Sequence, residues 1–101
     1  MTDTITFEEA CKGIAIEVAE TLIEKHKDYG VDNILIFKEQ GLVVRVWDKV
    51  SRLKNIIWNG TQATTLEDTW KDMAGYAIIG MMLQRDTFTN PLEGQVKEER
   101  Q

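Results

Sequence analysis

Residues 64–86, TTLEDTWKDMAGYAIIGMMLQRD, decide the fold because they predict one long helix that must lie at the centre of the molecule. Thr64 and Glu67 have the spacing of a capping box, which marks a helix start. No side chain from Met73 to Leu83 is charged. A helix here would expose apolar side chains on any side left uncovered. We therefore expect other helices to cover it on several sides.

Two further long helices are predicted before this segment. Thr6 and Glu9 form a second capping-box pair and Gly30 is a typical stop, so the first helix is expected over residues 7–29. The second is expected over LVVRVWDKVSRLKNIIW, residues 42–58, between Gly41 and Asn59–Gly60. Its apolar residues recur every three or four positions, which favours a helix over a strand. The residues expected to face the core are Phe7, Cys11, Ile14, Val18 and Leu22 in the first helix, and Val43, Val46, Val50, Leu53 and Ile57 in the second.

The remaining segments are shorter or less regular. Residues 31–40 predict a short helix capped by Asp32 or Asn33, or else an irregular connection. Residues 87–101 lose the helical periodicity and are expected to form a C-terminal arm or flexible tail. The sequence thus predicts an all-α fold of three long helices and a short one, in a single domain over residues 1–86.

Length and charge restrict the possible partners. A chain of 101 residues with 43% hydrophobic content forms one small core, and its net charge of −5 disfavours a nucleic-acid polymer as partner. No run is long enough to span a membrane, the amino terminus lacks the form of a signal peptide, and Cys11 is the only cysteine. We expect a cytoplasmic protein without disulfides. Because its apolar helix surface is large for a monomer of this size, we also expect a homo-oligomer.

Charged residues on the second long helix are the first candidates for a site. Arg45, Asp48, Lys49 and Arg52 recur on one helical face. The guanidinium groups suit bidentate contacts to phosphate, and Asp48 suits a divalent cation. The alternative is that Asp48 and Arg52 form an ordinary exposed ion pair.

The central helix supplies the second group of candidates. Asp68 and Asp72 lie one turn apart on the stripe that continues into Gly75 and Ile79, and with Glu67 they are either magnesium ligands or solvated acids. Tyr76 lies one turn beyond Asp72, where its ring stacks on a base or packs in the core. His26 and Cys11 lie on the apolar side of the first helix, where packing is the preferred interpretation.

Three segments together resemble a known family. Tyr29–Gly30, GLVVRVWDKVSRLKNI over residues 41–56 and LEDTWKDMAGYAIIGMML over residues 66–83 are similar to the nucleotide-modification-associated domain, found largely in bacteriophages. That family is grouped with the MazG-like, dimeric dUTPase-like all-α nucleoside triphosphate pyrophosphatases. The resemblance covers roughly residues 23–83. It implies a MazG-like helical bundle completed by assembly into dimers or tetramers, acting on nucleotides in the cytoplasm of an infected bacterium.

The same resemblance implies roles for individual residues. Asp48 and Asp72 would be catalytic, Arg45, Lys49, Arg52 and Tyr76 would bind the substrate, and Asp48, Glu67, Asp68 and Asp72 would hold Mg²⁺.

Two departures from the wider superfamily leave a second function open. MazG-like enzymes usually carry a glutamate pair three apart and then Glu-x-x-Asp, all binding magnesium. Here Glu17 and Glu20 have the first spacing but lie opposite the expected core stripe, and Thr69 stands where the second acid is expected. The first hypothesis is a Mg²⁺-dependent nucleoside triphosphate pyrophosphohydrolase. The second is a protein that sequesters a nucleotide or cyclic nucleotide against host defence without cleaving it. The third is a helical assembly protein whose polar stripes face water.

Overall fold

The computed structural model describes residues 4–61 and 65–95. Its elements are α1 (Phe7–Tyr29), α2 (Asp32–Leu35), α3 (Lys38–Leu53), a π-helical turn η1 (Lys54–Trp58), α4 (Leu66–Gln84) and a 3₁₀ turn η2 (Glu93–Gln95). Within these two ranges there is no strand, and the predicted all-α fold is confirmed. Across the same residues, no helix is both long enough and apolar enough to cross a membrane.

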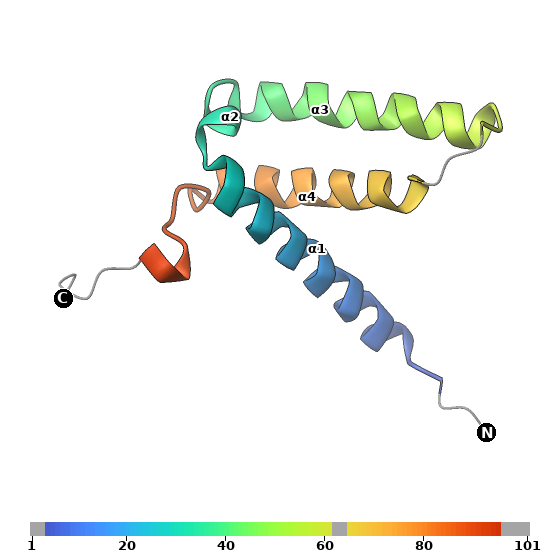
Figure 1. Cartoon of the computed structure of the whole chain (residues 1–101), viewed down its shortest axis with the longest axis horizontal. Coiled ribbons are helices and arrows are strands. Elements are labelled where there is room, and N and C mark those ends of the chain that lie inside the picture. The colour runs from blue at the N-terminus through green and yellow to red at the C-terminus, as the bar shows by residue number, and fades with distance from the viewer. Residues whose placement is uncertain (1–3, 62–64, 96–101) are drawn as a thin grey trace.

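α3 and α4 lie side by side and antiparallel, and α1 crosses them at an angle (Figure 1). The second half of α1 lies close to α4, whereas its first half points away from the α3–α4 pair toward the N-terminus (Figure 1). α4 packs against both other long helices. It therefore holds the central position that its apolar sequence predicted.

The ends of α1 follow from local hydrogen bonds. The backbone N–H of Glu9 donates to Oγ1 of Thr6 at 3.1 Å, and the N–H of Thr6 donates to Oε1 of Glu9 at 2.9 Å, which completes the predicted capping box. Gly30 ends the helix with φ +70°, and its N–H donates to the carbonyl of His26 at 2.9 Å. Both predicted ends of this helix are confirmed.

The start of α4 differs from that of α1. Thr64, the predicted capping residue, lies outside the described residues. Thr65 precedes the helix and makes no capping hydrogen bond through its side chain.

The connection between α1 and α3 differs from the prediction. α2 follows Val31, with no side-chain cap, so the cap predicted at Asp32 or Asn33 is wrong. α3 begins at Lys38, where φ is +51°, and Gly41 lies inside the helix instead of before it. A Cβ atom on Gly41 would lie 2.9 Å from Cβ of Phe37. This glycine is therefore required by a close contact and does not interrupt the helix.

The core lies at the end of the molecule where all the helices meet. Its buried residues are Ile34, Leu42, Ile79 and Phe88, surrounded by partly buried apolar side chains from α1, α2 and α4. Phe88 follows α4, yet only 5% of it is exposed, and its ring makes an edge-to-face contact with His26 at 5.3 Å. The expected tail therefore does not start at residue 87, because Phe88 belongs to the core.

The core-facing stripes were predicted only in part. Val18 and Leu53 are buried as expected, but Phe7 is 83% exposed, Val43 61% and Ile57 52%. α3 turns Leu42 and Leu53 inward, so Val43 and Val50 of the predicted stripe lie outside. Both helices carry apolar residues on more sides than one protomer covers.

Candidate functional site

A polar pocket of about 390 Å³ lies along α3, at its border with α4. Arg45, Asp48, Lys49 and Arg52 line it from successive turns of α3, and Tyr76 of α4 closes it. Spacings of three and four residues place these four side chains on one side of the helix. The structure thus brings together every candidate predicted on α3 with the tyrosine predicted on α4, while their roles stay predictions.

The polar side of α3 was expected to lie opposite the core, but it turns partly toward α4. Only 19% of the Lys49 side chain is exposed, because Lys49 reaches across to α4. Arg45 is half-buried, and its Nη2 donates to the backbone carbonyl of Asn33 at 3.5 Å. These cations line a groove between helices and are not on an open face.

Asp72 of α4 joins the three long helices through its contacts with two lysines. Its carboxylate accepts a hydrogen bond from Nζ of Lys25 on α1 at 3.1 Å, and Nζ of Lys49 on α3 lies 3.0 Å from its other oxygen. Burial alone would raise the pKa of Asp72, but the hydrogen bonds from Lys49 and Lys25 outweigh it, and the pKa is lowered. Asp72 therefore stays ionised and contributes to stability.

This contribution predicts a pH dependence. A carboxylate with a lowered pKa stabilises the fold fully above its ordinary pKa of about 4, and the effect disappears as the pH falls through the lower folded value. Asp72→Asn should therefore lower the free energy of unfolding by about 1–2 kcal/mol at pH 7. This value already allows for the partial exposure of the ion pairs to solvent. The deficit should shrink as the pH falls below the ordinary pKa, because Asp72 then becomes protonated first in the unfolded and then in the folded protein. Urea unfolding of both proteins across this range measures it.

Asp68→Asn is the matched control, because Asp68 is exposed one turn earlier on α4. It should change the stability and its pH profile much less than Asp72→Asn, because Asp68 makes only a small contribution to the pKa of Lys71. If Asp72→Asn had no effect at neutral pH, the lysine contacts would not stabilise the fold.

The predicted magnesium ligands do not converge within one protomer. In the described part of the chain, no three His, Cys, Asp or Glu side chains lie close enough to hold a metal ion. Asp48 is exposed in the polar pocket, Glu67 and Asp68 are exposed on the first turn of α4, and Asp72 is held by two lysines. The four predicted ligands therefore do not form one cluster among the described residues of a protomer.

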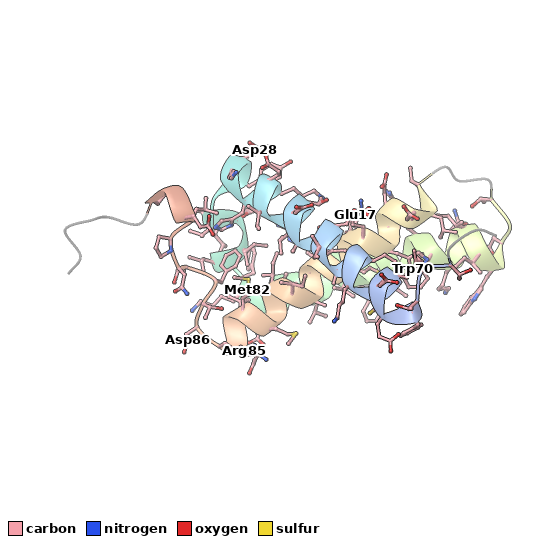
Figure 2. All side chains as sticks on the ribbon, turned by 90° about the horizontal axis from the view of Figure 1, so that it is seen from below. Glu17, Asp28, Trp70, Met82, Arg85 and Asp86 are labelled. Atoms are coloured by element: carbon pink, nitrogen blue, oxygen red, sulfur yellow. The ribbon has the colours of Figure 1, made fainter. Side chains whose placement is uncertain are left out.

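Glu17 and Thr69 also lie differently from expectation. Glu17 faces α4, where its carboxylate lies 3.0 Å from Nζ of Lys71 (Figure 2). The hydrogen bond and the charge of Glu17 raise the pKa of Lys71, with smaller contributions from Asp68 and Glu67. Thr69 is 1% exposed and donates to the carbonyl of Thr65 at 2.9 Å. Glu17 is thus paired with a protein cation, and position 69 is part of the packing.

A second, larger pocket of about 520 Å³ was not predicted. It lies between the second half of α1, α2, α4 and the segment after α4, and it shares Arg45 and Tyr76 with the polar pocket. Its other ring-bearing and amide side chains are His26, Tyr29, Phe88, Asn33 and Asn90. Because these residues come from three separate segments, no local motif identifies them. The only sequence signal is the presence of His26 and Tyr29 one turn apart on α1.

Comparison of the chain with protein-family models, with curated proteins and with solved structures gave no match. The geometry of the two pockets is therefore the basis on which a function is proposed.

Proposed function

We propose that this protein binds a nucleotide by its phosphates in the polar pocket of α3. The observation that carries the proposal is the convergence of Arg45, Lys49 and Arg52 on one pocket in a chain whose net charge is −5. Three cations on one small surface of an acidic protein favour a ligand with several negative charges. The resemblance to the nucleotide-modification-associated domain supports the same class of ligand.

The side chains suit phosphate in detail. Each guanidinium presents paired N–H donors that match two phosphate oxygens, and the Lys49 ammonium adds a point charge. Tyr76 brings a ring and a hydroxyl to the same wall. Lys49 already contacts Asp72, so an entering phosphate shares this cation with the carboxylate.

Binding without cleavage is the function that the geometry of one protomer supports best. The carboxylates needed for Mg²⁺ do not converge, and the buried Thr69 cannot supply one. We propose that the protein sequesters its nucleotide, or a cyclic nucleotide, as an anti-defence protein of a bacteriophage in the host cytoplasm.

One observation favours pyrophosphohydrolysis as a second candidate. Asp48 lines the same pocket as the arginines, so a carboxylate does lie beside the proposed phosphates. A second subunit would have to supply the remaining acids, which is compatible with the homo-oligomer that the resemblance implies.

Binding and product analysis separate the two candidates. The protein is incubated with the four ribonucleoside triphosphates, the four deoxyribonucleoside triphosphates and a cyclic dinucleotide, each with Mg²⁺ or with a chelator. A sequestering protein binds in both conditions and returns the ligand intact after denaturation. A pyrophosphohydrolase releases monophosphate and diphosphate, and chelation stops turnover. Failure of every one of these compounds to bind would contradict both candidates.

A further inference from the structure

We infer that the larger pocket takes the planar ring of the ligand whose phosphates occupy the polar pocket, so that one nucleotide spans both. This inference rests on the proposed function. It adds that the ring of the ligand is the part that the protein recognises.

The two pockets are adjacent and share lining side chains. Arg45 and Tyr76 line both of them. Arg45 is also tied to the backbone of Asn33, which lines the larger pocket. A ligand with an anionic end and a ring end therefore lies along one path, with Arg45 and Tyr76 at its middle.

The larger pocket has the size and lining of a site for a ring. Its volume of about 520 Å³ falls within the range of about 300–1,000 Å³ that is usual for small-molecule sites. Its lining combines apolar side chains such as Leu22, Ile79 and Met82 with aromatic side chains. The charged side chains of Lys25, Lys71 and Asp72 also line it. Met82 lies on α4 near its C-terminal end (Figure 2). The aromatic side chains suit stacking on a planar base.

The pocket also offers groups that distinguish one base from another. Asn33 and Asn90 come from different segments, one from α2 and one from the segment after α4. Each side-chain amide offers donors and an acceptor, which is the pattern needed to read the edge of a nucleobase. The backbone N–H of Asn90 donates to the carbonyl of Thr87 at 3.1 Å, so its position is fixed by a turn.

The test compares a nucleoside triphosphate with inorganic tripolyphosphate by titration calorimetry. The triphosphate preferred in the panel above should bind at least about tenfold more tightly than tripolyphosphate, because stacking of a base is typically worth about 1–3 kcal/mol. Tyr29→Ala should lower the affinity for the nucleotide by about tenfold and leave that for tripolyphosphate unchanged. Tyr29 is 68% exposed at the pocket, so this change should not disturb the core.

Two more variants complete the design. Trp58→Ala removes an aromatic side chain that is 74% exposed and lines neither pocket, and it should affect neither ligand. Asn90→Ala should change the order of preference among the bases. If nucleotide and tripolyphosphate bound equally well and Tyr29→Ala changed neither affinity, the proposal that the larger pocket binds the ring would be wrong. The proposal of a phosphate site would be unaffected. If neither compound bound, the proposed function would fall and the inference with it.

Discussion

Arg45→Ala is expected to weaken binding of a nucleoside triphosphate by about 10–100-fold, because each charge-assisted hydrogen bond contributes about 1.5–3 kcal/mol. Arg45 lines both pockets and is held by the carbonyl of Asn33. Its loss removes a contact to the phosphates of the ligand. It also removes the side chain that lies between the proposed phosphate pocket and the proposed ring pocket. Titration calorimetry with and without Mg²⁺ measures the change.

Two variants test whether the geometry of Arg45 matters as well as its charge. Arg45→Lys keeps the charge but loses the planar fork, so it should restore only part of the affinity. Arg85→Ala is the matched control, since Arg85 is exposed just after α4 and lines neither pocket. If Arg85→Ala lowered the affinity as much as Arg45→Ala, the effect would come from net charge and not from the pocket.

Val50→Glu is expected to separate an assembled wild-type protein into monomers. Val43, Val50 and Ile57 recur every seven residues on the outer side of α3 and η1, which is the spacing of a helix–helix seam. All three are exposed in the protomer. We propose that a second copy covers them, in which case a buried, unpaired carboxylate would cost several kcal/mol.

Sedimentation velocity at micromolar concentration tests this assembly. The wild type should have a multiple of the protomer mass of 11.6 kDa, and Val50→Glu should have that mass itself. Ser51→Glu introduces the same charge at the next exposed position and should leave the assembly intact. A monomeric wild type would remove the proposal.

Helix ends could be predicted from the sequence, because they depend on interactions between residues close together in the chain. The capping box of Thr6 and Glu9 and the positive φ of Gly30 and Gly60 depend on neighbouring residues alone. The inward faces of α1 and α3 could not be predicted, since apolar residues lie on several sides of each helix. The start of α3 was missed because Gly41 looked like a break, whereas its contact with Phe37 decides its role.

The same division holds for the candidate site. Arg45, Asp48, Lys49 and Arg52 could be grouped because one helix fixes their spacing. The role of Asp72 could not be predicted, since Lys25 lies 47 residues away in the chain. Tertiary packing brings these two groups together, so a predicted metal ligand is also an ion-paired residue.

α1 joins the α3–α4 pair from about Glu17 onward, and we expect this limited contact to favour one order of folding. α3 and α4 are consecutive in the chain, so their pairing closes a short loop and costs little entropy. α1 can then dock onto a hairpin that is already formed. The larger pocket lies between α1 and that hairpin, so a ligand there binds both and favours the docked state. We expect α1 to be the helix that proteases reach most readily when no ligand is bound. A bound nucleotide would hold α1 in place, so the nucleotide concentration in the cell would affect the lifetime of the protein.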